Sequence, residues 1–156
     1  NYANLSPYTP VPIKEKTFTY SATGQGAGMV GLPGDISPPS RFVKMVFSTK
    51  MAVQPTNAKA ATILADHIIG TVFIPIGLVR ASKSAGLAGY EQTQWTVLKD
   101  LKNHILYFKT YNQPMLQSID LNKLNFAKGS AVLSIPMTTP APFSMDITQS
   151  YKTKKS

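Results

Sequence analysis

The sequence predicts an α+β protein, and three observations point to that class. Residues 38–51 and 57–70 carry apolar or small side chains at helical spacing. Residues 92–120 are instead rich in aromatic and other strand-forming side chains and are interrupted by turn-like segments. With 156 residues, 43% of them hydrophobic and 15% charged, the composition is that of one packed domain.

The N-terminal part predicts a strand, a glycine-rich loop and a helix, in that order. Residues 13–20 have the pattern of a strand, and the glycine-rich loop follows them. Ser37 is the expected N-cap, with Pro38 at the first helical position, where the missing N–H of a proline costs nothing. One face of this helix is expected to consist of Phe42, Met45, Val46 and Met51, with Arg41, Lys44 and Ser48 around it. Lys44 is expected to lie on the solvated face.

A second helix is expected to begin at Thr56 or Asn57 and to end near Gly70. Its small and apolar residues recur at helical spacing at Ala58, Ala61, Ala65 and Ile69. Because these side chains are short, we expect the helix to pack closely on a neighbouring element.

Residues 92–98, 104–110 and 115–120 predict an antiparallel meander, and residues 132–135 a further strand. The aromatic side chains of the meander are Trp95, Tyr107, Phe108 and Tyr111. They allow two interpretations: a platform on which a ligand stacks, or the core face of a sheet, which is the more common use of such residues. The last residues, 151–156, read as a basic tail.

Few residue types in this chain can do chemistry. It has no cysteine, and therefore holds no disulfide, thiolate metal site or cysteine nucleophile of its own. His67 and His104 lie apart from any cluster of metal-ligating residues, and we expect both to be structural or on the surface. The seven carboxylates are scattered without a pair that suggests acid–base work. No metal site and no cofactor site is predicted.

The formal net charge of +9 raises the question of a nucleic-acid partner. Three of the sixteen basic residues, Lys152, Lys154 and Lys155, lie in the last five positions, and the others form no stripe on a predicted helix. We therefore expect no nucleic-acid binding. No apolar run approaches the ~20 residues that span a bilayer, so no membrane partner is expected either.

The string "GAGMVG", residues 26–31, matches the glycine spacing of dinucleotide-binding folds. That motif requires a helix directly after the last glycine and an acidic residue about 20 positions later. Here a turn sequence, "LPGD", follows Gly31, and no acidic residue occurs between Asp35 and Asp66. The glycines therefore predict a connection in which the backbone turns sharply or approaches another group, not a phosphate site.

Two segments carry a resemblance to a known family. "GAGMVGLPGDISPPSRFVK", residues 26–44, resembles the loop and helix of the choloylglycine hydrolase family, which contains penicillin V acylases and conjugated bile acid hydrolases. Residues 94–126 resemble the C-terminal strand meander of the same family, and the opening "NYANLS" is similar to the segment that follows the middle of such enzymes. The resemblance implies part of an N-terminal nucleophile hydrolase, a four-layer αββα sandwich whose two antiparallel sheets face each other between helical layers.

The resemblance also implies an activity. Enzymes of this family attack linear amides with an N-terminal cysteine through an acyl-enzyme, and they need no coenzyme or metal. Because this chain starts with Asn1 and has no cysteine, we expect residues 1–150 to be the C-terminal portion of one such domain, with the nucleophile in an upstream portion of the same polypeptide. The alternative is a non-catalytic basic binding or structural module that has lost the nucleophile.

Only one active-site residue of the family maps onto this chain: the arginine of "SRF", Arg41. A guanidinium beside a thiol favours the thiolate and lowers the thiol pKa. The competing interpretation is an ordinary surface arginine on a helix. If Arg41 is catalytic, the glycines before it are expected to carry the backbone past the active-site cleft and into this helix: Gly24, Gly26, Gly28, Gly31 and Gly34.

The substrate, partners and location follow from the resemblance alone. It implies a small-molecule amide as substrate, and penicillin V, conjugated bile acids and N-acyl homoserine lactones stay open as alternatives. Homo-oligomers, often tetramers, are expected by analogy with the family. A periplasmic or secreted location is expected by analogy with Gram-negative relatives.

Overall fold

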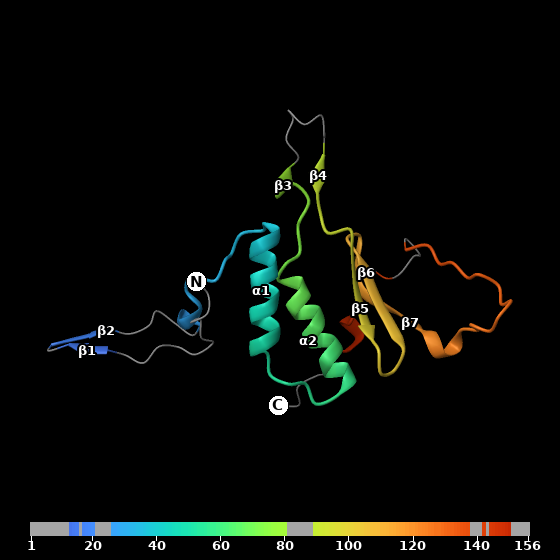
Figure 1. Ribbon diagram of the computed structural model, residues 1–156, viewed down its shortest axis with the longest axis horizontal. Helices are drawn as coiled ribbons and strands as arrows, with labels where there is room; N and C mark the ends of the chain where they lie inside the picture. The colour runs from blue at the N-terminus through green and yellow to red at the C-terminus, as the bar shows by residue number, and fades with distance from the viewer. Residues whose placement is uncertain are drawn as a thin grey trace.

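The structure is a computed structural model, which describes residues 13–15, 17–20, 26–80, 89–137, 142 and 144–150. Within these residues, helices α1 (Pro38–Met51) and α2 (Ala58–Gly70) lie side by side, and a three-stranded sheet lies next to α2 (Figure 1). The sheet consists of β5 (Trp95–Asp100), β6 (Ile105–Thr110) and β7 (Gln113–Asp120). The predicted basic tail, residues 151–156, lies outside the described residues.

Residues 13–15 and 18–20 form two short strands that pair with each other, so the prediction of one continuous strand over residues 13–20 is wrong. Strand β1 (Ile13–Glu15) pairs antiparallel with β2 (Phe18–Tyr20), and Ile13 stands opposite Tyr20. Pairing of the two strands satisfies backbone N–H and C=O groups that a lone strand of the same length leaves without partners. A second short pair, β3 (Val79–Arg80) and β4 (Tyr90–Glu91), precedes the main sheet.

Both helices begin close to where the sequence predicts, and α2 also ends there. Pro38 is the first residue of α1, and its N-cap position is Ser37. Asn57 is the N-cap of α2, where its side-chain oxygen accepts a hydrogen bond of 2.9 Å from the backbone N–H of Ala60. Such a bond satisfies one of the N–H groups that the first turn of a helix leaves unpaired. Gly70 is the last residue of α2, as predicted.

The meander prediction is confirmed, because β5, β6 and β7 pair in sequence order and antiparallel. Val97 stands opposite Phe108, and Phe108 opposite Gln117. Residues 132–135, however, form no strand, and Val132 is 98% exposed. Apolar composition alone does not make a strand, which also requires a partner for its backbone groups.

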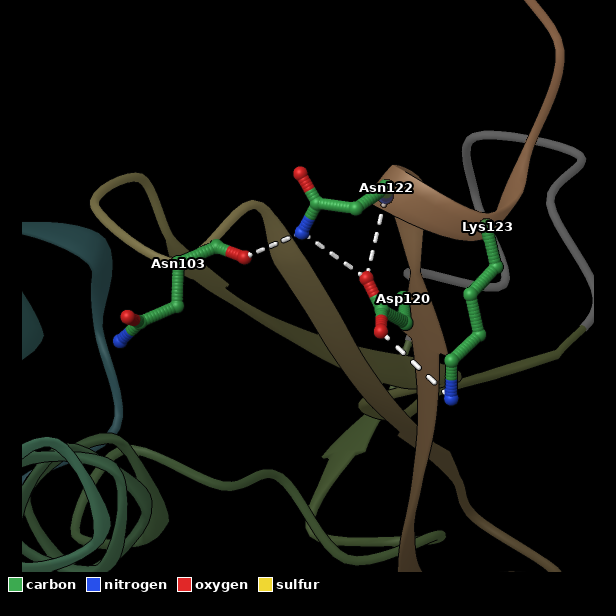
Figure 2. A network of polar contacts seen from close by, with 4 residues as sticks. All are labelled: Asn103, Asp120, Asn122 and Lys123. Carbon is green, nitrogen blue, oxygen red and sulfur yellow. Dashed lines mark hydrogen bonds and ion pairs between the residues drawn. The ribbon is translucent and has the colours of Figure 1, made fainter.

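A polar network holds one end of the sheet together (Figure 2). The side-chain amide of Asn122 donates to the carbonyl of Asn103, at 2.9 Å, and to Oδ1 of Asp120, at 3.0 Å. Lys123 Nζ lies 3.6 Å from Oδ2 of the same carboxylate. The network therefore joins the β5–β6 turn to the end of β7. His104 is the last residue of that turn, with a φ of 56°, and its ring Nδ1 lies 3.1 Å from Oδ1 of Asn122.

The described residues bury few apolar side chains. Ile74 and Phe108 are the buried hydrophobic residues among them. On α1 the predicted apolar face is largely open, since Phe42 is 69% and Val46 50% exposed, whereas Met45 lies toward α2 in a pocket between the helices. The small residues Ala61 and Ala65 of α2 line the same pocket, which places them where α2 packs against α1 and β5.

Candidate functional site

The loop before α1 requires glycine at two positions. Gly26 and Gly31 have φ values of +83° and +97°, in the left-handed region that other residues rarely adopt. A Cβ at Gly26 would also lie 3.1 Å from the Met29 side chain. Between them, Ala27–Met29 form a 3₁₀ turn closed by a 2.9 Å hydrogen bond from Met29 N–H to the Gly26 carbonyl. These glycines therefore shape the turns that lead toward α1.

The other glycines of this loop differ from that expectation. Gly28 and Gly34 have no left-handed φ, and a Cβ at Gly34 would meet nothing within 4 Å. Gly24 lies outside the described residues. The conformational argument thus applies to Gly26 and Gly31, and the predicted approach of this loop to a cleft stays a prediction.

The first turn of α1 is held by Asp35, a residue that the sequence reasoning did not single out. Ser37 occupies the N-cap position, but its hydroxyl makes no capping bond to the helix backbone. Instead, Asp35 Oδ1 accepts from the Ser37 N–H at 2.9 Å, and Oδ2 accepts from the Ser40 hydroxyl at 2.5 Å. Oγ of Ser37 also lies within hydrogen-bond distance of Oγ of Ser40, at 3.1 Å. The spacing D-x-S-x-x-S is the sequence signal that could have revealed this arrangement.

The serines hold Asp35 in its ionised form. Hydrogen bonds from the Ser37 side chain, the Ser40 side chain and the Ser37 backbone lower the pKa of Asp35 to about 2. Ser40 itself is buried, with 8% of its surface exposed. A carboxylate at this place also lies near the positive N-terminal end of the α1 dipole, which stabilises the negative charge of the carboxylate.

Arg41 directly follows Ser40 in this anchored turn. Its backbone N–H donates to the Ser37 carbonyl at 3.0 Å, the first hydrogen bond of the helix. The residue is half-buried, and its Nε is buried with no hydrogen-bond partner. Of the ion pairs between described residues, one joins Lys109 to Asp66 and the other joins Lys123 to Asp120, so neither engages Arg41. The helix therefore fixes the backbone of Arg41, and the buried Nε is a donor without an acceptor among the described residues.

Lys44 departs from the expectation that it lies on the solvated face of α1. It is half-buried, and its Nζ donates to the carbonyl of Thr71 at 3.4 Å. Thr71 is the residue directly after the end of α2. The reason is the orientation of α1, which turns Lys44 toward the end of α2 and turns Phe42 outward. Lys44 is therefore a link between the two helices.

The remaining candidates are not brought together with Arg41. His67 and His104 are both exposed, as expected for structural or surface residues. Across the described ranges, no group of three or more histidine and carboxylate side chains is placed to hold a metal ion. No helix in this part of the chain is long and apolar enough to cross a membrane.

The four aromatic residues of the meander do not share one face. Phe108 is buried, which supports its interpretation as core, while Trp95 is 53% exposed. Tyr107 precedes Phe108 in the same strand and therefore points to the opposite face. Tyr111 stacks on Phe73 with ring centroids 5.7 Å apart, and its hydroxyl accepts from the Ile76 N–H at 3.3 Å. The structure thus does not support a single stacking platform.

A pocket of about 330 Å³ lies in the seam between α1 and α2, and it is lined mainly by apolar side chains. Its lining includes Met45, Ala61, Ala65 and Leu98, but Arg41 is not part of it. Because the polar groups described above lie elsewhere, we regard this pocket as loose packing between the helices. The candidate site is Arg41 on its anchored turn.

Comparison with known proteins relates both segments of the chain to one family. A family model described as linear amide C-N hydrolases, choloylglycine hydrolase family, matches residues 1–135. The bile salt hydrolase/transferase of Clostridium perfringens is 34% identical over 119 residues, which cover 76% of this chain and 35% of that protein. The protein of the same name from Lactiplantibacillus plantarum is 27% identical over 143 residues, covering 92% and 43%. The chain thus spans between 35% and 43% of the length of these relatives.

Solved structures agree with the predicted fold class. A variant of conjugated bile acid hydrolase from C. perfringens is similar with a TM-score of 0.67 and 32% identity, over 80% of this chain and 37% of that one. Penicillin V acylase from Agrobacterium tumefaciens is similar with a TM-score of 0.54 and 24% identity, over 66% and 31% of the two chains, which bears on the fold alone. The prediction of an α+β chain forming part of the N-terminal nucleophile hydrolase sandwich is confirmed.

Proposed function

This chain belongs to the choloylglycine hydrolase family of linear amide C–N hydrolases, and from that premise we propose that it is the C-terminal segment of an amidase whose cysteine nucleophile lies outside it. Two facts support this division. The chain contains no cysteine, and it spans little more than a third of the C. perfringens relative. The substrate is a linear amide such as penicillin V, a conjugated bile acid or an N-acyl homoserine lactone.

The observation that carries the proposal is the state of Arg41. The resemblance of residues 26–44 assigns it to the family's active-site arginine, and its Nε is buried without a hydrogen-bond partner. A buried donor without an acceptor is costly, which favours an acceptor supplied by a part of the protein beyond the described residues. A guanidinium next to a thiol stabilises the thiolate through its charge. Arg41 thus has the properties that a supporting group for a cysteine nucleophile needs.

In the proposed reaction the thiolate sulfur attacks the amide carbonyl carbon, and the C–N bond then breaks. The α-amine of the nucleophilic residue takes the proton of the thiol and delivers it to the departing amine. A water oxygen then attacks the acyl carbon, which releases the carboxylic acid and restores the thiol. Arg41 exchanges no proton in these steps: it keeps the sulfur ionised and holds neighbouring groups with its fixed fork of donors.

The test is an assay of the complete protein on penicillin V, on glycine- and taurine-conjugated bile acids and on N-acyl homoserine lactones. We expect hydrolysis of at least one of these amides, and an acyl-enzyme detectable by mass spectrometry after rapid quenching. Iodoacetamide should abolish the activity by alkylating the nucleophile. A folded complete protein that is inert to every one of these amides would contradict the proposal.

A second candidate is a basic binding or structural module without chemistry. The net charge of +9 and the absence of cysteine favour this alternative. The sequence of the gene upstream of Asn1 discriminates the two at little cost. A preceding segment whose mature form begins with cysteine supports the amidase, and a gene without such a segment supports the module.

We also propose that the complete protein is a homo-oligomer located in the periplasm or outside the cell. The exposed apolar side chains of α1, among them Phe42 and Val46, support covering by the upstream portion or by another copy. Light scattering on the complete protein measures its mass, and cell fractionation measures its location. A monomer would contradict the first part, and recovery in the cytoplasmic fraction the second.

A further inference from the structure

The turn that carries Arg41 is organised around one carboxylate. Asp35 uses both of its oxygens on the first turn of α1: Oδ1 for the Ser37 N–H at 2.9 Å and Oδ2 for the Ser40 hydroxyl at 2.5 Å. Ser40 is buried, so its hydroxyl has little access to water as a substitute partner. The residue that follows Ser40 is Arg41, whose own N–H is bonded to the Ser37 carbonyl at 3.0 Å.

The nearby Asp35 carboxylate forms no ion pair with the Arg41 guanidinium. Asp35 lies only six positions before Arg41, yet its oxygens are occupied by the two serines. Arg41 makes no ion pair with a carboxylate of the described ranges, and its Nε stays without a partner. The carboxylate therefore fixes the backbone beneath Arg41 without neutralising the side chain.

We propose that Asp35 is a positioning residue for Arg41. It acts through Ser37 and Ser40 to fix the first turn of α1, and with it the backbone from which the Arg41 side chain extends. The inference rests on the proposed function, in which Arg41 supports the thiolate. A small displacement of a group that must face a reacting atom lowers the rate far more than it lowers stability. Removing the Asp35–Ser40 bond should thus impair catalysis in a fold that persists.

The experiment uses the complete protein with Asp35→Asn, Ser40→Ala, Arg41→Lys and the double variant Asp35→Asn/Arg41→Lys. The asparagine can still accept the Ser37 N–H, but its amide nitrogen cannot accept the Ser40 hydroxyl. Asp146→Asn is the matched control, because Asp146 also accepts from a nearby hydroxyl and N–H: Thr148 Oγ1 at 2.6 Å and Thr148 N at 2.8 Å. It belongs to a different turn of the chain.

The primary measurement is the rate at which iodoacetamide alkylates the nucleophile as a function of pH, which reports its thiolate fraction without any substrate. The second is kcat for penicillin V or a glycine-conjugated bile acid. We expect Asp35→Asn and Ser40→Ala to lower kcat about 10- to 100-fold with little change in KM, and to shift the alkylation profile to higher pH. Asp146→Asn should match the wild type in both measurements.

The double variant shows whether Asp35 acts through Arg41. We expect Asp35→Asn to lower kcat less than about threefold when Arg41 is already lysine, since the group it positions is gone. An equal loss in both backgrounds, or a lowered unfolding midpoint with an unmoved alkylation profile, would overturn the positioning role while Arg41→Lys stays impaired. Full activity of Arg41→Lys would instead overturn the assigned role of Arg41, and the positioning role with it.

Discussion

The Nζ of Lys109 lies 2.6 Å from Oδ1 of Asp66, an ion pair that ties strand β6 to helix α2. The two side chains are 20% and 25% exposed, so the pair is partly withdrawn from water. Because Lys109 contacts α2, its side chain lies on the face of the sheet that α2 covers. Phe108, its neighbour in β6, therefore points to the opposite face. The pair therefore lies at the contact that orders the helical layer on the sheet.

Lys109→Met in the complete protein should lower the free energy of unfolding by about 1–3 kcal/mol, since it leaves the Asp66 carboxylate partly buried without its partner. Denaturant unfolding measures the change. The control is Lys123→Ala: Lys123 pairs with Asp120 at 3.6 Å, but its side chain is 81% exposed. An exposed pair of this kind contributes at most about 0.5–1 kcal/mol. Equal effects of the two substitutions would show that the Lys109–Asp66 pair gains nothing from its burial.

Arg41→Lys in the complete protein should hurt catalysis far more than folding. Lysine keeps the charge but replaces a planar fork of donors with a point donor, so the positioning of neighbouring groups is lost. Arg41→Ala removes the charge too, and we expect the pKa of the nucleophile to rise. A rise of one unit corresponds to about 1.4 kcal/mol between the two protonation states. The pH–rate profile and the unfolding midpoint are the measurements to compare.

The control for Arg41 is Lys50→Ala. Lys50 is a basic residue in the last turn of the same helix, and it is exposed. Lys44 serves less well, because its contact with the Thr71 carbonyl links α1 to the end of α2. Small and equal effects at Arg41 and Lys50 would identify Arg41 as an ordinary surface arginine.

Residues 1–156 expressed alone should be catalytically inactive and poorly stable. The chain has no cysteine, and the described part buries only Ile74 and Phe108 among its hydrophobic side chains. Calorimetry should show no cooperative thermal transition, and a dye such as ANS should bind. A sharp transition for this chain alone would contradict the prediction.

The helices and the meander could be predicted because their signals are local. Pro38 starts α1 by fixing its own φ, and Asn57 caps α2 through a bond to Ala60, three residues away. The turn between β5 and β6 likewise depends on Asp100, which accepts from the Asn103 N–H at 2.9 Å. Each of these interactions is encoded within a few residues, so composition and spacing are sufficient to find it.

What the sequence did not predict depends on partners that are distant in the chain. The environment of Lys44 depends on Thr71, 27 residues away, and spacing on one helix says nothing about that contact. Val132 is apolar but 98% exposed, because an apolar segment forms a strand only where another strand accepts it. Asp35 was missed for a different reason. Its carboxylate bonds to the first turn from two positions before the N-cap, and capping patterns consider the N-cap residue and the residue three positions after it.

The Asp35 carboxylate should stabilise the start of α1 only while it is ionised. Hydrogen bonds from the Ser37 and Ser40 side chains, and from the Ser37 backbone, lower its pKa from the ordinary 3.8 to about 2. A lowered pKa in the folded state means that the stabilisation is complete above the unfolded pKa and is lost as the pH falls through the folded one.

In the complete protein, Asp35→Asn should therefore lower the urea midpoint by a constant amount above about pH 5, and the difference from wild type should shrink between about pH 4 and pH 2. The pKa values of Asp100, Asp120 and Asp146 are also lowered by hydrogen bonds, but these residues are present in both proteins, so the difference isolates Asp35. A midpoint difference that persists undiminished to about pH 2 would mean that the charge of Asp35 contributes nothing to the turn beneath Arg41.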